Sequence, residues 1–223
     1  MNFERLYEII YMIYTDCGIV EFPIDCFEVV RKYGYQIIGY SELSQKKKAA
    51  CQKLSGDACL IDDTLYYEEN AHPGRIKFSI AHELGHIFLE TESEDYCDCF
   101  ASHFLAPRIM IHRGGYRNAD QIHETFGLSY AAANRALADY QRWFHHSYYA
   151  AIQPTSPEIL LAQKFDKKYT QTLLCPKQSF VSDDQGITDK RLLTYLKNSF
   201  YEQRKASIHG TPINEYLMYR YSF

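Results

Sequence analysis

A five-residue motif, His-Glu-x-x-His, lies within the apolar segment 78–89 and most constrains how this chain can fold. On an α-helix, residues four positions apart lie on the same face, with their Cβ atoms about 5–6 Å apart. His82 and His86 can therefore bind one metal ion between their rings, at about 2.0–2.1 Å per Zn–N bond. Glu83 lies about 100° further round the helix, where it can take a proton from water without binding the ion. The motif thus predicts a helix that carries a hydrolytic zinc site.

The apolar residues around the motif decide between this interpretation and a simpler one. Two histidines four residues apart also occur in ordinary helices as partly buried side chains. Here, however, the rest of the helix has the composition of a core element, with apolar residues at Ile76, Ile80, Leu84, Ile87 and Phe88. Burying polar side chains among such residues costs free energy unless they have partners, and a bound metal ion supplies one. The sequence therefore favours the metal site.

A hydrolytic zinc site also needs a third protein ligand and one open position. The residues after the motif include several that could bind the ion, namely Glu90, Glu92, Glu94, Asp95, Asp98 and His103. Residues 94–106 have a helical pattern that ends at Pro107. Glu94 and Asp98 are one helical turn apart, so one can bind the ion while the other orients a ligand histidine. Glu94 could instead be a solvated acid that favours the helix dipole, and we expect His103 to be a packing or surface residue.

The same segments resemble a known family of enzymes. FSIAHELGHIFLE, EDYCDCFASHFLAPRIMI and IHETFGLSYAAANRAL are similar to sequences of the ImmA/IrrE family of metallopeptidases. The resemblance covers about residues 55–145 and implies a gluzincin-like site, in which a glutamate from the next helix joins the two histidines. Carried over by position, it implies His82, His86 and Glu94 as zinc ligands. It also implies Glu83 as the catalytic base and Asp98 as the residue that holds a ligand histidine.

The expected fold class is α+β. Residues 3–16 have the pattern of an amphipathic helix, and helical patterns recur through most of the sequence up to about residue 146. Together with the family resemblance, this predicts a mainly helical, zincin-like metallopeptidase domain over residues 1–150. Two prolines near residue 155 suit a boundary, so residues 151–223 are expected to form a C-terminal extension of unknown role.

A small β-sheet is expected beside the motif helix. Ala58–Ile61 and Thr64–Tyr67 are short strand patterns separated by two aspartates, which predicts a hairpin. In zinc peptidases of this general kind, an edge strand near the metal helix pairs with an extended substrate. Leu65–Glu68 is our candidate for that strand, although an ordinary sheet edge is an equally good interpretation.

Composition excludes several classes of partner. A net charge of −4 and a pI near 6.1 argue against a nucleic-acid-binding surface. The seven cysteines show no repeated metal-binding spacing, which is typical of free thiols in a reducing cytosol. The apolar runs are too short for a membrane span, and the N-terminal residues lack the features of a signal peptide. We therefore expect a cytoplasmic protein that binds neither nucleic acid directly nor membranes.

The expected activity is that of a zinc-dependent endopeptidase. Bound zinc lowers the pKa of a water molecule to about 7 and polarises the scissile carbonyl, and Glu83 passes the water's proton to the leaving amine. A donor for the oxyanion is also needed, and the sequence offers Tyr66, Tyr67, Arg75, Tyr96 and His103. The resemblance implies a protein substrate, often a helix-turn-helix transcriptional repressor of a prophage or mobile element.

Two other interpretations are compatible with the sequence. A non-catalytic, metal-stabilised binding module could sequester a regulator without cutting it, and a fourth protein ligand would close its metal site. A metal-free helical interaction protein would contain no zinc. Glu83 beside an intact pair of histidines favours the enzyme, because a structural zinc site needs no general base.

Overall fold

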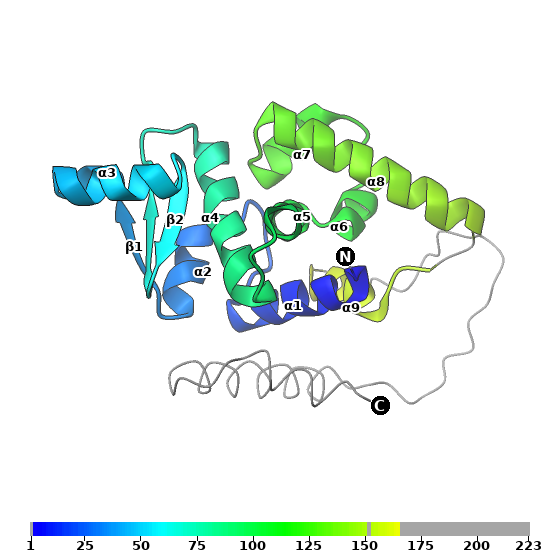
Figure 1. Cartoon of the computed structure of the whole chain (residues 1–223). Helices are drawn as coiled ribbons and strands as arrows, with labels where there is room; N and C mark the ends of the chain where they lie inside the picture. The colour runs from blue at the N-terminus through cyan, green and yellow to red at the C-terminus, as the bar shows by residue number, and fades with distance from the viewer. Residues whose placement is uncertain (1, 151–152, 166–223) are drawn as a thin grey trace. The chain divides into compact units, whose positions relative to one another are not determined.

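The computed structural model describes residues 2–150 and 153–165, which all lie within one compact unit, Met1–Lys177. These residues are mainly helical, with one three-stranded sheet (Figure 1). In chain order, the elements are α1 (Phe3–Asp16), α2 (Cys26–Lys32), β1 (Gln36–Gly39), the 3-10 helix η1 (Tyr40–Glu42), α3 (Gln45–Leu54), β2 (Ala58–Ile61), β3 (Thr64–Tyr67), α4 (Pro73–Leu89), α5 (Glu94–Leu105), α6 (Arg108–Gly114), α7 (Ala119–Phe126), α8 (Tyr130–Ala150) and α9 (Ser156–Phe165). The expected α+β fold is confirmed. Most of the expected C-terminal extension, residues 166–223, lies outside the described residues.

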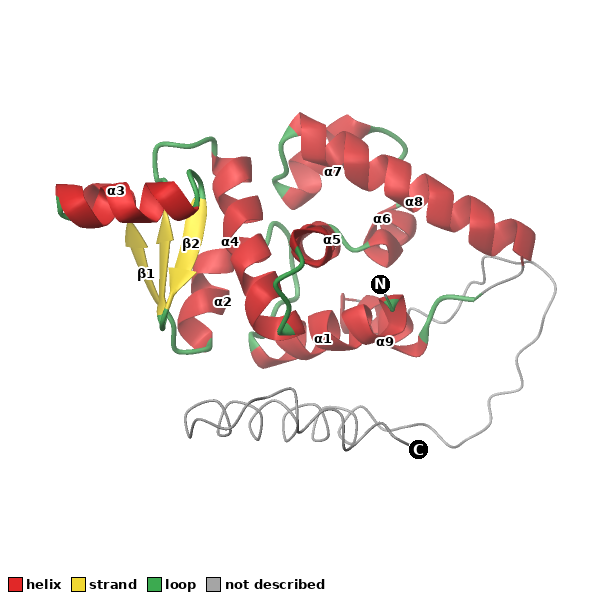
Figure 2. Ribbon diagram, in the orientation of Figure 1, coloured by secondary structure: helices red, strands yellow, loops and turns green. Residues whose placement is uncertain are grey.

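The sheet has the strand order β1-β3-β2. The predicted hairpin is confirmed, because β2 and β3 pair antiparallel with Leu60 opposite Leu65. The prediction that Leu65–Glu68 forms an edge strand is wrong, because β1 pairs parallel with β3 on its other side, with Ile37 opposite Leu65. The edge strand next to the motif helix is β2 (Figure 2).

Helix α4 carries the motif and lies between the sheet and α5 (Figure 2). Two residues favour the start of the helix at this point. The His72 side chain caps it by accepting a hydrogen bond from the N–H of Gly74. Pro73 occupies the first helical position, where its missing N–H costs no hydrogen bond. It ends at Glu90, which adopts a left-handed conformation with φ of 50°. One face of α4 is buried in the core, which leaves the polar face free to hold the motif side chains.

Gly85 lets α4 and α5 approach closely. A Cβ atom on Gly85 would lie 3.0 Å from the Cα and 3.2 Å from the Cβ of Cys97 on α5, tighter than ordinary van der Waals contact. Helix pairs pack with axes about 8–10 Å apart depending on the side chains at the crossing, and a glycine permits the short end of that range. The motif helix and the start of α5 are therefore held side by side.

Helix α1 is buried on nearly all sides. Every residue from Leu6 to Tyr14 is buried except Glu8, whereas an amphipathic surface helix buries only one stripe. Part of the cover comes from α9, where the ring of Phe165 lies 6.0 Å from that of Tyr14. Helix α9 follows the boundary expected after residue 150 and nevertheless contacts α1 and α6.

A buried ion pair joins α6 to α9. Arg108 Nε donates to Glu158 Oε1 at 2.8 Å, and the two side chains are only 9% and 1% exposed. The Arg108 guanidinium also lies 4.3 Å above the ring of Phe3 and 5.1 Å from that of Trp143. Buried charges of this kind are tolerated only when they are paired, so the pair ties α9 to the helices before the expected boundary.

Two composition-based expectations can be compared with the described residues. None of their helices combines the length and the apolar character needed to cross a bilayer. Their cysteines are all free thiols, four of them buried, namely Cys26, Cys51, Cys59 and Cys97.

Candidate metal centre

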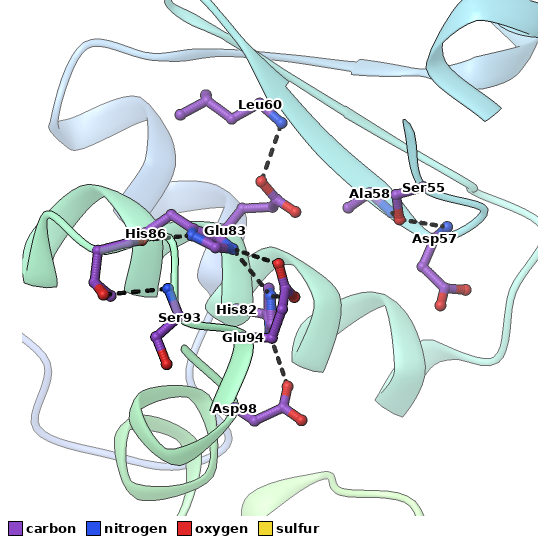
Figure 3. A network of polar contacts seen from close by, with 11 residues as sticks. Ser55, Asp57, Ala58, Leu60, His82, Glu83, His86, Ser93, Glu94 and Asp98 are labelled. Atoms are coloured by element: carbon purple, nitrogen blue, oxygen red, sulfur yellow. Dashed lines mark hydrogen bonds and ion pairs between the residues drawn. The ribbon is translucent and has the colours of Figure 1, made fainter. Parts of the chain in front are cut away.

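The two motif histidines face each other on one side of α4. His82 Nε2 lies 3.2 Å from His86 Nε2, and the side chains are 16% and 20% exposed (Figure 3). Two imidazole nitrogens bound to one tetrahedral zinc ion at about 2.0–2.1 Å would be about 3.3 Å apart. The two histidines therefore share one face of α4, as predicted, and their Nε2 atoms have about the spacing that one zinc ion requires.

In each histidine ring, the hydrogen-bond partner of Nδ1 decides which nitrogen carries the hydrogen and whether Nε2 has a free lone pair. His86 Nδ1 lies 2.8 Å from the carbonyl oxygen of Thr91, which can only accept, so Nδ1 carries the hydrogen. His82 Nδ1 lies 2.7 Å from Asp98 Oδ1, and the same assignment follows for an ionised carboxylate. In neutral rings with these tautomers both Nε2 atoms are unprotonated, and each can offer a lone pair to a metal ion.

Glu94 adds a third acceptor to this pair. Its Oε2 lies 3.0 Å from His82 Nε2, and its Oε1 lies 3.7 Å from His86 Nε2. Two lone pairs and a carboxylate at these distances repel one another in the neutral-ring state, and a divalent cation between them removes the repulsion. The donor set therefore fits a zinc ion, and the structure brings together all the residues that the sequence predicts for the site.

Glu83 lies beside this group but points towards the sheet. Its Oε2 accepts from the N–H of Leu60 on β2 at 3.0 Å (Figure 3). Burial raises the pKa of the Glu83 carboxyl above its usual value, while the neighbouring His86 and His82 oppose the shift. A carboxylate that holds a proton more readily than usual is suited to act as a general base and then as an acid.

Cys97 is a site residue that the sequence analysis did not predict. One donor atom of each of Cys97, His82 and His86 lies within 4.8 Å of the others. The side chain is fully buried, and burial raises the pKa of its thiol to about 12, helped by nearby carboxylates of which Glu94 has the largest effect. The available signal was its position three residues after Glu94, which places both on one side of α5.

A cavity of about 710 Å³ opens over the site, between the edge strand β2 and helix α4. Cys97 is not part of its lining, which consists of Leu54, Ser55, Asp57, Ala58, Cys59, Leu60, Phe78, Ser79, His82, Glu83, His86, Glu92, Glu94 and Asp98. The side chains proposed from the sequence as oxyanion donors do not line it. His103 is buried and bonds to Tyr7 and Asp139 instead, as expected for a packing residue.

A comparison with known protein families shows which family this chain resembles. Residues 43–138 match the family model Peptidase_M78, the IrrE N-terminal-like domain. This segment is similar to the IrrE N-terminal-like domain. The resemblance to the ImmA/IrrE family is thus confirmed, and the matched segment contains both motif histidines, Glu83, Glu94 and Asp98. No curated protein and no solved structure gives a significant match to the chain.

Proposed function

We propose that this protein is a zinc-dependent endopeptidase whose metal is held by His82, His86 and Glu94. The observation that carries the proposal is the spacing of three potential zinc ligands: the two histidine Nε2 atoms are 3.2 Å apart, and a Glu94 oxygen lies 3.0 Å from His82 Nε2. The match to a peptidase family supports hydrolysis as the reaction. When bound, zinc would supply a Lewis acid that polarises a peptide carbonyl and makes water acidic enough to attack it.

The chain's own residues account for the proton transfers. The N–H of Leu60 holds Glu83 Oε2, which leaves Oε1 to take a proton from the attacking water and pass it to the leaving amine. Asp98 keeps the hydrogen of His82 on Nδ1, so that Nε2 remains a ligand throughout. Burial keeps the pKa of the Glu83 carboxyl raised, which favours its uptake of the proton from water.

The edge strand β2 is the proposed binding site for the substrate backbone. It lines the cavity along Ala58, Cys59 and Leu60, and only its other edge is paired, with β3. An extended peptide can add to such an edge through main-chain hydrogen bonds, which would place one peptide bond beside the histidines. This strand takes the role that the sequence analysis gave to Leu65–Glu68.

Charge favours a basic substrate segment. Asp57, Glu92, Glu94 and Asp98 line the cavity, and part of this negative charge remains after a divalent ion is bound. Nucleic-acid-binding proteins carry clustered lysine and arginine residues. A helix-turn-helix transcriptional repressor of a prophage or mobile element, which the family resemblance implies, would meet this requirement.

The test is cleavage of a helix-turn-helix repressor encoded beside this chain, with Glu83→Gln as the variant. We expect zinc content to stay at the wild-type level while cleavage is lost, because the amide cannot take the proton. Glu90→Gln is the matched control, since it removes the same charge at the end of the same helix outside the cavity lining. Equal cleavage by the Glu83→Gln variant would refute the mechanism.

A second function is favoured by one observation, the position of Cys97. A thiolate near two histidines and a carboxylate offers the fourth protein ligand that closes a structural zinc site. The protein would then be a metal-stabilised module that binds a regulator without cutting it. Stable, zinc-dependent binding of the repressor with no cleavage by the wild-type chain would favour this function.

A further inference from the structure

We propose that Cys97 is a fourth protein donor to the ion and that its thiolate takes the coordination position that hydrolysis needs open. The proposal rests on the metal site of the proposed function. It adds an inactive form of the enzyme, in which the thiolate occupies that position. With Cys97 bound, the ion has four protein ligands and no position for water or substrate, which is the arrangement of a structural zinc site. With Cys97 withdrawn, the site is hydrolytic.

The environment of Cys97 is the first argument. Its side chain is fully buried, yet within the described residues no hydrogen bond engages the sulfur. The buried thiol lies within 4.8 Å of one ring nitrogen of each histidine, whereas Glu94 has 76% of its side chain exposed. Thiolate, imidazole and carboxylate are all ordinary zinc ligands, so the set is chemically consistent.

The distances are the second argument. Donor atoms of a tetrahedral zinc ion with Zn–N bonds of about 2.0–2.1 Å and a Zn–S bond of about 2.3 Å lie about 3.3–3.6 Å apart. The sulfur is within 4.8 Å of both histidine donor atoms, so it needs to move by no more than about 1.5 Å. A change in the rotation about the Cα–Cβ bond provides movements of this size.

Gly85 supplies the third argument. Its missing side chain brings the backbone of Cys97 to within 3.0 Å of the position a Cβ would occupy, directly between the two histidines in sequence. A residue with a side chain at this point would push α5 and its thiol away from the ion. The same contact that holds the two helices together therefore also holds the sulfur near the site.

The exchange of Cys97 for water on the ion needs no other reactant. Binding of Cys97 would convert its thiol to a thiolate and form one sulfur–metal bond. It would break the bond between the ion and the water in the fourth position, and release that water and one proton to solvent. Withdrawal reverses these changes, and no oxidant or reductant takes part. Glu83 keeps its contact with Leu60 in both forms, but has water to act on only when the thiol has left.

X-ray absorption spectroscopy of the zinc-loaded full chain tests the proposal without depending on activity. We expect one sulfur at about 2.3 Å in the wild-type protein and only nitrogen and oxygen neighbours in the Cys97→Ala and Cys97→Ser variants. The cobalt-substituted wild-type protein should show the near-ultraviolet sulfur-to-cobalt charge-transfer band, and the variants should lack it. Cys99→Ala, two residues further along α5 and outside the group of donor atoms that Cys97 forms with the two histidines, is the matched control and should behave as wild type.

Metal affinity and cleavage complete the test. Loss of a residue that only orients a ligand weakens metal binding about 10–100-fold, so loss of Cys97 should raise the zinc dissociation constant at least about tenfold. The Cys97→Ala variant, loaded with zinc, should cleave the repressor faster than the wild type. Wild-type spectra without sulfur, with equal affinity in the Cys97→Ala and Cys99→Ala variants, would overturn the proposal.

The outcomes for cleavage separate this proposal from the proposed function. Sulfur coordination with equal cleavage by wild type and Cys97→Ala would refute the claim that the thiolate closes the site. Sulfur coordination with no cleavage by either protein would refute the peptidase function and leave Cys97 as the fourth ligand of a binding module. Unfolding curves of the variants, followed by circular dichroism, check that each chain is folded before these results are compared.

Discussion

Asp98 Oδ1 lies 2.7 Å from His82 Nδ1, across the junction between α5 and the motif helix. This contact orients the ring and keeps its other nitrogen free to bind a cation. It also means that one helical turn of α5 supplies both groups on which the histidine depends, because Glu94 lies 3.0 Å from the opposite nitrogen of the same ring. The candidate metal site is thus formed by the packing of two consecutive helices.

Replacing Asp98 with alanine should weaken zinc binding by about 10–100-fold, because His82 loses the partner that fixes its tautomer and orientation. Competition with a chromophoric chelator measures the change. Asp95→Ala removes an exposed carboxylate from the same turn of α5 and should have a much smaller effect. Equal weakening by the two substitutions would show that general electrostatic attraction, and not this hydrogen bond, accounts for the loss.

Replacing Gly85 with alanine should separate α4 from α5. The new methyl group would meet the backbone of Cys97 at 3.0 Å, and overpacking of this kind costs about 1–3 kcal/mol of unfolding free energy. Zinc binding should weaken as well, because Glu94 and Asp98 both move with α5. Gly56→Ala is the control, since no atom lies within 4 Å of its added methyl group. Chemical denaturation compares the two, and similar stabilities would contradict the close approach.

The sequence predicted the motif helix and the common face of its two histidines because these depend on local geometry. The spacing of His82 and His86 determines their common face once a helix forms, and the cap at His72 and Pro73 is also local. The role of Cys97 could not be predicted in the same way. It depends on how α5 crosses α4 at Gly85, which is a relationship between two helices and not a property of either.

The order of the strands in the sheet could not be predicted from the sequence pattern either. The hairpin of β2 and β3 is local and was predicted. The other edge of β3, however, pairs with β1, and η1, α3 and β2 lie between these two strands in the sequence. That parallel pairing makes β3 central and leaves β2 at the edge. Helix α1 shows the same limitation, because its pattern predicts one buried stripe and the tertiary structure covers its other faces too.

Removing one partner of the buried ion pair should destabilise the protein strongly. Glu158→Ala leaves the Arg108 guanidinium buried without its counter-charge, and losses of this type are about 3–5 kcal/mol. Glu28→Ala breaks an exposed pair with Arg31 and should cost less than about 1 kcal/mol. The midpoints of urea unfolding measure both. A small effect of Glu158→Ala would mean that α9 contributes little to the stability of this unit.

His103 should make stability depend on acid pH. Burial lowers the pKa of this imidazole from 6.5 to about 4, although Asp139 opposes the shift. As the pH falls from about 6.5 to about 4, the unfolded chain takes up a proton that the folded chain does not. The residue's contribution is therefore complete above pH 6.5 and declines by about 1.4 kcal/mol per pH unit through this window.

The comparison with His103→Gln isolates this effect from other titrating groups, including the metal ligands. Glutamine keeps a polar side chain near Tyr7 but does not titrate, so the stability advantage of the wild type should shrink as the pH falls from 6.5 to 4. Urea unfolding at several pH values gives the difference curve. Parallel curves for the two proteins would show that His103 does not resist protonation.

The central claim is that two imidazoles and a carboxylate hold one divalent cation, and native mass spectrometry of the purified full chain tests it most directly. After purification in chelator-free buffer, we expect one zinc ion per wild-type chain and none in the His82→Ala/His86→Ala variant. Wild-type protein without metal, or a variant that retains zinc at the wild-type level, would contradict the account.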